Sequence, residues 1–294
     1  MPAPSPYAAA LSAIPRRDRD LTILGARTHV AEYGPADAPR TLVVVHGFRG
    51  DHHGLEPVIA HLPDLRIIAP DLPGFGASAP LPGREHDIVG YAEWLDALLT
   101  ALEVRGTAVL LGHSFGSIVV AGALAAGVPA PRSVLINPIG QPALAGPRGI
   151  LTRGAVAFYR VGAMLPERAG FALLRSRAIT RIMSVSMAKT REKSLRRWIH
   201  EEHDRFFSGF AERDSLLEAF RASVSNDVSD FAAEVPVPTL LIAAEQDDIT
   251  PLEAQHRLVR LFPDARLVVV PDVGHLVHYE APAAAARAIR EFLA

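Results

Sequence analysis

The sequence predicts an α/β protein with a mostly parallel sheet that carries helices on both faces. Short apolar runs alternate with segments of helical periodicity along most of the 294 residues, which is the pattern of repeated strand and helix units. A stretch from about residue 139 to residue 232 breaks this pattern, because it has helical periodicity and no buried-strand run. We therefore expect one sheet with a helical insertion between two of its strands.

The expected elements follow in chain order. Residues 1–19 are expected to be an N-terminal arm, and residues 20–33, with Gly25 between two short runs, to be an antiparallel hairpin that opens the sheet. Further strands are expected at the apolar runs 41–45, 66–70, 107–112, 132–136, 237–244 and 266–271. The helical insertion therefore falls between the sixth and seventh strands.

Composition limits the class of protein and its compartment. A formal net charge of −2 argues against a nucleic-acid partner, and no stretch approaches the roughly 18 apolar residues of a membrane span. The start of the chain lacks a basic region followed by an apolar core, so we expect no signal peptide and a cytoplasmic location. The absence of cysteine excludes disulfides and thiol chemistry. We expect a small-molecule substrate as partner, and a homodimer stays open.

A short motif, Gly112-His113-Ser114-Phe115-Gly116, lies between an apolar run and an alanine-rich helical run. A strand must turn into a helix here within about one residue, which forces Ser114 into a strained backbone conformation and leaves no room for a Cβ at either glycine. The serine hydroxyl is then exposed above the strand end, beside the N–H of Phe115 at the start of the helix. The alternative for an isolated motif is a helix N-cap serine, but the turn favours a nucleophile.

Four other strand ends carry residues that suit catalysis. Each is a polar or glycine-containing turn after an apolar run: His46-Gly47-Phe48, Asp71-Leu72-Pro73-Gly74, Glu245-Gln246-Asp247-Asp248 and Asp272-Val273-Gly274-His275. With these segments in this order, the sequence resembles the α/β-hydrolase superfamily from about residue 20 to residue 294. It is similar in particular to the capped branch, which includes epoxide hydrolases, haloalkane dehalogenases, C–C hydrolases and esterases.

The resemblance implies an eight-stranded, mostly parallel sheet and a division of the chain into two parts. Residues 20–138 and 233–294 would form the α/β-hydrolase core, and residues 139–232 would form an inserted helical cap, or lid.

The resemblance also implies a catalytic triad in the order nucleophile, acid, histidine, and this predicts Ser114, Asp247 and His275. Serine needs a general base to take its proton, and a buried carboxylate must hold the imidazole in the required tautomer. Asp247 is preferred to Asp248 because strand residues alternate faces and because its position matches the family spacing. The other position at which relatives carry the acid, after the sixth strand, holds the neutral Asn137. Asp248 stays open as the alternative.

In the same arrangement, the backbone N–H groups of Phe48 and Phe115 would converge on one point and form an oxyanion hole. The catalytic side chains and these two donors supply every role that hydrolysis requires, so we expect no metal and no organic cofactor. The segment His200-Glu201-Glu202-His203 does not change this expectation, because its histidines are three apart and no third ligand is obvious. His278 competes with His275 for the role of base, but Gly274 favours the earlier histidine.

The cap is expected to contribute some apolar walls to the substrate pocket. Its apolar residues have a helical spacing that predicts packing of the cap on itself: Phe158, Tyr159, Met164, Phe171, Met183, Met187, Trp198, Phe206, Phe207 and Phe210. Some of them should also form apolar pocket walls. The candidate substrate-binding residues are His52, Phe158, Met183 and Met187.

The cap region is basic, because residues 148–205 contain 13 Lys+Arg and 5 Asp+Glu. The simpler interpretation is that these cations lie on solvated helix faces. The alternative is that a few of them attract an anionic substrate: Arg153, Arg160, Arg177 or Arg181.

Ser114 narrows the predicted chemistry, because epoxide hydrolases and haloalkane dehalogenases need a carboxylate at that position. A serine with a base and an oxyanion hole suits hydrolysis of an ester or lactone of a small, largely apolar substrate through an acyl-enzyme. The alternatives are hydrolysis of a C–C bond in a ring-cleavage diketone and a lyase that uses the triad as a base. A non-catalytic receptor on the same fold is a fourth hypothesis.

Overall fold

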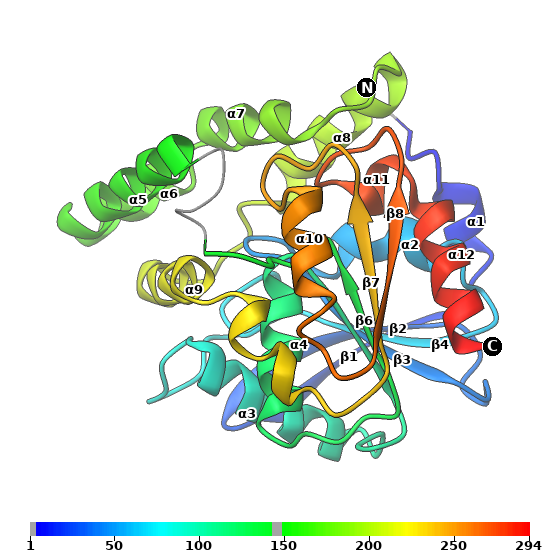
Figure 1. Cartoon of the computed structure of the whole chain (residues 1–294). Helices are drawn as coiled ribbons and strands as arrows, with labels where there is room; N and C mark the ends of the chain where they lie inside the picture. The colour runs from blue at the N-terminus through cyan, green and yellow to red at the C-terminus, as the bar shows by residue number, and fades with distance from the viewer. Residues whose placement is uncertain (1–3, 143–148) are drawn as a thin grey trace.

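The computed structural model describes residues 4–142 and 149–294 and has the predicted α/β fold (Figure 1). Eight strands form one sheet in the order β1-β2-β4-β3-β5-β6-β7-β8. Their bounds are β1 Arg16–Ile23, β2 Ala26–Tyr33, β3 Thr41–Val45, β4 Arg66–Pro70, β5 Val109–His113, β6 Ser133–Ile136, β7 Thr239–Ala244 and β8 Ala265–Val270. The pairs β1/β2 and β2/β4 are antiparallel and the other pairs are parallel, so the predicted fold class is confirmed.

The first strand begins earlier than the sequence suggests. β1 starts at Arg16, so residues 16–19 pair with β2 although we assigned them to an N-terminal arm. Their side chains are exposed, which leaves no apolar run to predict the strand from. The strand forms because its backbone pairs with the buried β2.

Helices cover both faces of the sheet. Successive apolar residues of a strand point to opposite faces, so both faces must be buried. Along β3, Val43 and Val45 face a core built with α3 (Ile88–Ala101) and α4 (Phe115–Ala125). Leu42 and Val44 face the opposite core, built with α2 (Glu56–Ile59) and α12 (Pro282–Leu293). The remaining short elements are α1 Ala8–Ser12, η1 His52–Leu55, η2 Val228–Asp230, η3 Ala232–Glu234, α10 Leu252–Leu258 and α11 Val277–Glu280.

Five α-helices lie between β6 and β7 in the described chain. Their bounds are α5 Gly149–Met164, α6 Glu167–Leu174, α7 Arg177–Met187, α8 Lys193–Phe206 and α9 Arg213–Ser225. In Figure 1, α5 to α8 extend across the end of the sheet toward which β7 points, so they cover the carboxyl ends of the parallel strands. We call α5–α9 the inserted helices.

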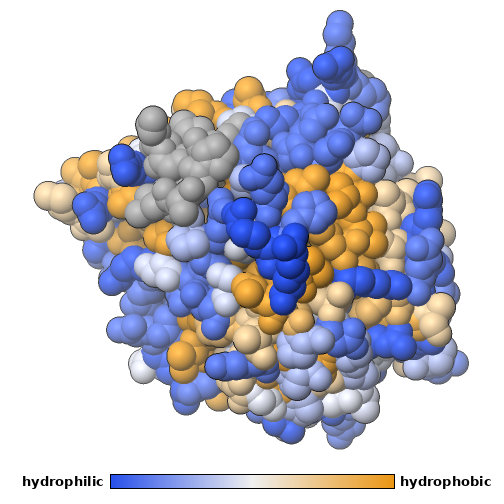
Figure 2. All heavy atoms as spheres, viewed as in Figure 1, coloured by the Kyte–Doolittle hydropathy of each residue, from blue (hydrophilic) through white to orange (hydrophobic). Residues whose placement is uncertain are grey.

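The inserted helices do not bury all of their apolar residues. Val161 and Met164 of α5 and Ile182 and Val185 of α7 are exposed, and Figure 2 shows apolar side chains along the outer edge of these helices. Met164 is 86% exposed, so the expectation that its spacing predicts packing inside the cap is wrong for this residue. None of the described helices has the length and apolar character that spanning a membrane would require.

Candidate active site

Ser114 lies at a sharp turn between β5 and α4. Its φ is +52° and its ψ is −117°, a strained conformation for a residue with a side chain. A Cβ at Gly112 would lie 2.3 Å from the carbonyl oxygen of Gly116, and a Cβ at Gly116 would lie 2.2 Å from the carbonyl oxygen of Val45. Both positions therefore require glycine, as the motif predicts, and the turn places Ser114 at the carboxyl ends of the central strands.

The structure brings Ser114, His275 and Asp247 into one hydrogen-bonded row. Ser114 Oγ lies 2.9 Å from His275 Nε2, and His275 Nδ1 lies 2.7 Å from Asp247 Oδ2. Since a carboxylate only accepts, Nδ1 carries the proton that faces Asp247, and Nε2 is left with its lone pair toward the serine hydroxyl. This tautomer is the one in which an imidazole can take a proton from Ser114.

The Asp247 carboxylate is stabilised in its ionised form. Burial alone would raise its pKa, but the His275 side chain and hydrogen bonds from Thr250 outweigh burial, and the pKa lies below its usual value. Asp247 Oδ2 accepts from Thr250 Oγ1 at 2.6 Å, and Oδ1 accepts from the backbone N–H groups of Ile249 and Thr250 at 2.7 and 3.0 Å.

Asp248 and His278, the alternative candidates for the acid and the base, are not part of this hydrogen-bonded row. The Asp248 carboxylate pairs with the ammonium of Lys189, a residue of the segment between α7 and α8. His278 is buried beside His113, with the ring centroids 4.0 Å apart, and makes no hydrogen bond to Ser114.

Asn137, which the sequence singled out only as a missing acid, holds the histidine loop in place. Its side-chain amide donates to the carbonyl oxygen of His275 at 2.7 Å, and its carbonyl oxygen accepts from the N–H of Ala244 at 3.1 Å. Asn137 has a φ of +43° at the end of β6 and is completely buried. The residue thus connects the loop of His275 to β7, the strand that precedes Asp247.

The loop after β3 lies against the Ser114 turn. A Cβ at Gly47 would lie 3.4 Å from Ser114 Cβ, and the rings of Phe48 and Phe115 are in edge contact with centroids 6.2 Å apart. Within residues 4–142 and 149–294, neither the N–H of Phe48 nor that of Phe115 donates a hydrogen bond. Both N–H groups are therefore free donors, one in the loop that contacts the Ser114 turn and one in the residue that follows Ser114.

His46 orients this loop. Its Nδ1 donates to the carbonyl oxygen of Gly47 at 2.8 Å, and its Nε2 accepts from the N–H of Leu72 at 2.9 Å. Burial lowers the pKa of His46, so its neutral form, which alone can make both bonds, is favoured.

A cavity of about 170 Å³ opens beside Ser114. Its apolar walls come from the core and from the inserted helices: Phe48, Met183, Met187, Phe207, Ile249 and Leu276. Met183 and Met187, two of the candidate substrate-binding residues, are part of this lining. A larger cavity of about 630 Å³ lies between α3 and α4, but its described lining contains no histidine and no serine.

Two of the four candidate substrate-binding residues are not in the described lining of the cavity beside Ser114. His52 is buried and its ring bonds Asp71, so it faces away from the cavity. Phe158 packs against Tyr159 and the core of the sheet. The four cap arginines that could attract an anion are also absent from the lining, and Arg181 pairs with Asp204.

Three further histidines line the cavity and are held neutral by burial. Burial lowers the pKa of His113 and of His203 to about 3, and that of His278 well below its usual value, with neighbouring histidines adding to each shift. Among the described residues, His113 Nε2 and His278 Nδ1 have no hydrogen-bond partner. Both nitrogens are therefore buried polar groups that the described structure leaves without a partner.

The neutral histidines predict that the protein loses stability in mild acid. An unfolded histidine binds a proton below about pH 6.5, while folded His113, His203 and His278 do not, so the free energy of unfolding falls as the pH falls from 6.5 toward 3. Each group should contribute a loss of about 2 kcal/mol between pH 7 and pH 5. His53 acts in the opposite direction, because Asp51 outweighs burial and raises its pKa.

The measurement is chemical unfolding between pH 8 and pH 5, with His203→Asn as the matched variant. Asparagine keeps a hydrogen-bonding group near Ser184, which accepts or donates at 2.7 Å from His203 Nδ1, but it does not titrate. The free energy of unfolding of the variant should change less steeply with pH, because unfolding of the variant takes up about one proton fewer. An unchanged slope would show that His203 is protonated in the folded protein.

Arg49 was missed by the sequence analysis. It follows the loop residue Phe48, is 1% exposed and has a φ of +65°. Its guanidinium donates to four neutral acceptors of the inserted helices and their connections: Phe207 O at 3.1 Å, Tyr159 Oη at 3.0 Å, Leu174 O at 2.8 Å and Ser208 Oγ at 3.2 Å. One core side chain thus joins three separate parts of the insertion. The sequence offered no signal for this contact, since an arginine after Gly47-Phe48 looks like a solvated loop residue.

Arg49→Met should lower the stability of the protein. The variant leaves buried acceptors without a donor, at a cost of about 3 kcal/mol, which corresponds to a fall in Tm of about 5 °C for a chain of this size. Arg160→Met is the matched control, because Arg160 is an exposed residue of α5 beside Tyr159. Thermal unfolding of both variants checks the prediction, and equal Tm values would contradict it.

The segment His200–His203 does not form a metal site in the described structure. His200 Nδ1 lies 2.6 Å and His203 Nδ1 lies 2.7 Å from the same hydroxyl, Ser184 Oγ, so a serine occupies the position between them.

Comparison with known proteins agrees with this architecture. Residues 42–288 match the family model described as alpha/beta hydrolase family. The chain is 28% identical over 282 residues to the uncharacterized hydrolase YugF of Bacillus subtilis, an alignment that covers 94% of this chain and 97% of that protein. It is 29% identical over 282 residues to 2-hydroxy-6-oxo-2,4-heptadienoate hydrolase of Pseudomonas putida, and this alignment covers 92% of this chain and 94% of that protein. A thermophilic esterase from Thermogutta terrifontis has a similar solved structure, with a TM-score of 0.74, 25% identity, and 94% and 98% covered.

The match extends from β3 to α12 and so includes Ser114, Asp247 and His275. The chain therefore belongs to the alpha/beta hydrolase family.

Proposed function

We propose that this protein is a serine hydrolase that cleaves an ester or lactone bond of a small, largely apolar and uncharged substrate. The observation that carries the proposal is the row of contacts from Ser114 Oγ to His275 Nε2 at 2.9 Å and from His275 Nδ1 to Asp247 Oδ2 at 2.7 Å. A hydroxyl, an imidazole and a buried carboxylate in this geometry make the serine a nucleophile.

The reaction has two halves. His275 takes the Ser114 proton while Oγ attacks the ester carbonyl, and it then gives that proton to the leaving alkoxide as the acyl-enzyme forms. A water molecule repeats the attack on the acyl-enzyme, with His275 again as base, and releases the acid and free Ser114. In both halves the negative oxygen would be held by the N–H groups of Phe48 and Phe115, which have no other acceptor in the described chain.

The cavity supports a small and neutral substrate. Its volume of about 170 Å³ lies below the roughly 300–1,000 Å³ of pockets that hold drug-sized ligands. Its described lining is mostly apolar and contains no lysine or arginine. A carboxylate on the substrate would therefore lose its hydration without gaining a permanent cation.

The second candidate is hydrolysis of a C–C bond, and the Pseudomonas putida relative is the observation that favours it. The name of that protein gives its substrate as a 2-hydroxy-6-oxo-dienoate, which carries a carboxylate. The lining without a cation argues against such a substrate here.

A substrate panel tests the proposal. We expect steady turnover of p-nitrophenyl acetate and butyrate, faster than turnover of the long-chain decanoate, and no cleavage of a 2-hydroxy-6-oxo-dienoate. A fluorophosphonate should attach covalently to Ser114 and stop the ester reaction. Cleavage of the dienoate in preference to every ester would replace the proposal with the second candidate. If the protein cleaves neither the esters nor the dienoate and the fluorophosphonate does not label Ser114, the result would favour a non-catalytic receptor.

A further inference from the structure

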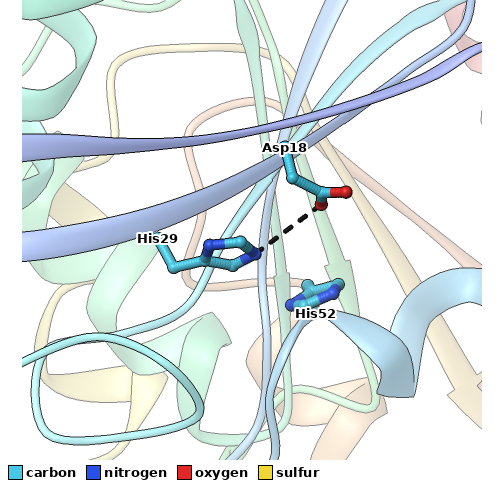
Figure 3. A group of neighbouring side chains, drawn as sticks. All are labelled: Asp18, His29 and His52. Carbon is cyan, nitrogen blue, oxygen red and sulfur yellow. Dashed lines mark ion pairs between the residues drawn. The ribbon is translucent and has the colours of Figure 1, made fainter.

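A group of metal-ligating side chains lies outside the Ser114 site, between the edge of the sheet and the η1 turn. Asp18 comes from β1, His29 from the neighbouring β2 and His52 from the start of η1. Each offers one ligand atom, and the three atoms lie within 4.8 Å of one another. Figure 3 shows the Asp18 carboxylate and the His29 ring turned toward each other, with the His52 ring beside them. The distance from His29 Nε2 to Asp18 Oδ1 is 3.7 Å.

Both imidazoles are oriented by a second carboxylate. His29 Nδ1 lies 3.1 Å from Asp20 Oδ1, and His52 Nδ1 lies 2.8 Å from Asp71 Oδ1. Because a carboxylate only accepts, each Nδ1 carries a proton and each Nε2 has a free lone pair. Metal-binding histidines commonly have this arrangement, in which a carboxylate holds Nδ1–H and the other nitrogen binds the ion.

A cationic side chain already occupies the space between these groups. Arg16 Nη2 donates to Asp18 Oδ1 at 2.9 Å and lies 3.2 Å from His52 Nε2. The lone pair of His52 is thus directed at a positive charge. Arg16 is also bonded to Glu56 through Nη1 at 2.9 Å, and its side chain is 35% exposed, so it can turn toward Glu56 and solvent without losing every partner.

We propose that Asp18, His29 and His52 bind a divalent metal ion of the zinc type, in competition with the guanidinium of Arg16. Two imidazole nitrogens and one carboxylate oxygen are a ligand set that zinc accepts, with a fourth position left open to water. Ligand atoms around tetrahedral zinc are about 3.4 Å apart, so the three donors must each move by roughly 1 Å or less from their present separation.

A metal at this position would link elements at the edge of the sheet, away from the cavity beside Ser114. It would join the edge strand β1, its neighbour β2 and η1, the turn that follows the loop of Phe48 and Arg49. The proposal does not depend on the chemistry of Ser114, because none of the three ligands lines the cavity beside that residue in the described structure.

A neighbouring group, Asp51, His52 and His53, is a weaker candidate for the same ion. Asp51 Oδ1 accepts both from the ring and from the backbone N–H of His53, each at 3.0 Å. The His53 ring also stacks on Phe206, with the centroids 4.0 Å apart. Binding there would break the cap of η1 and this stacking, whereas binding at Asp18 and His29 would displace only Arg16.

The test uses the full-length protein after treatment with a chelator and desalting. Zinc is titrated by calorimetry, and cobalt(II) is titrated by its visible absorption, which reports the geometry of the ligands. We expect one ion per chain and a rise in Tm of about 4 °C at a zinc concentration a hundred times the Kd. Asp18→Ala and His29→Ala should each weaken binding by about tenfold or more. Arg16→Ala should strengthen it by about tenfold, because the competing charge is removed.

Two histidine variants are the matched controls. His256→Ala removes an exposed histidine of α10, and His53→Ala removes the neighbouring group, and both should leave the zinc affinity unchanged. The proposal is overturned if neither the wild type nor Arg16→Ala binds zinc or cobalt. It is also overturned if His53→Ala abolishes binding while His29→Ala does not, or if Arg16→Ala binds no more tightly than the wild type.

Discussion

Ser114→Ala should lose on the order of 10³-fold or more in turnover of a short-chain ester, with its Tm unchanged. The loss is large because the hydroxyl is the attacking group, and the members of a triad act as a unit, so the remaining two residues retain little activity. The Tm should not change, since the side chain is only half-buried and its one hydrogen bond to His275 can be replaced by water. Alanine also carries the same Cβ into the strained turn, so the substitution adds no backbone strain.

The measurement is kcat for p-nitrophenyl butyrate together with fluorophosphonate labelling and thermal unfolding. The variant should no longer be labelled, which ties the loss of turnover to the nucleophile itself. Turnover within tenfold of the wild type would show that the serine does not attack the substrate. A large fall in Tm would mean that the kinetic loss reports misfolding. In that case Ser114→Cys, which keeps a nucleophile at the same position, is the variant to test. Its labelling with the same probe would show that a nucleophile at this position reacts.

Asp247→Asn should lose about 10⁴-fold in turnover, the size known for this substitution in serine proteases. The Asp247 carboxylate accepts from His275 Nδ1 and from Thr250 Oγ1 on the same oxygen, Oδ2. An asparagine amide that turns its NH₂ group toward His275 would favour the tautomer with the proton on Nε2. That tautomer donates toward Ser114 instead of accepting its proton.

Asp248→Asn is the matched control at the next residue. Asp248 pairs with Lys189, and its side chain is 40% exposed, so loss of its charge should reduce turnover by less than about tenfold. The two variants are compared at saturating ester after circular dichroism has shown that both are folded. If Asp248→Asn is the inactive variant, the acid has been assigned to the wrong residue.

Much of the site could be predicted because its signals are local in the sequence. The turn at Ser114 needs glycine at two fixed positions, and each candidate residue follows an apolar run that forms a parallel strand. Parallel strands end at the same edge of the sheet, so residues that follow β3, β5, β7 and β8 meet although they are distant in the chain. Alternation and order are properties of the sequence itself, and they predicted the fold class. Together with the resemblance to the α/β-hydrolase superfamily, they predicted the candidates Ser114, His275 and Asp247.

Only the tertiary structure decided the contacts between segments that are distant in the sequence, because no local sequence pattern specifies the relative position of such segments. Arg49 is a loop arginine in the sequence and a buried anchor of the inserted helices in the fold. His52 looked like a pocket residue because it follows the Phe48 loop, but its ring turns to Asp71, from a different strand end, and so faces Asp18 and His29. The direction of a polar side chain depends on which partner lies within about 3 Å, and for partners far apart in the chain that distance exists only after folding.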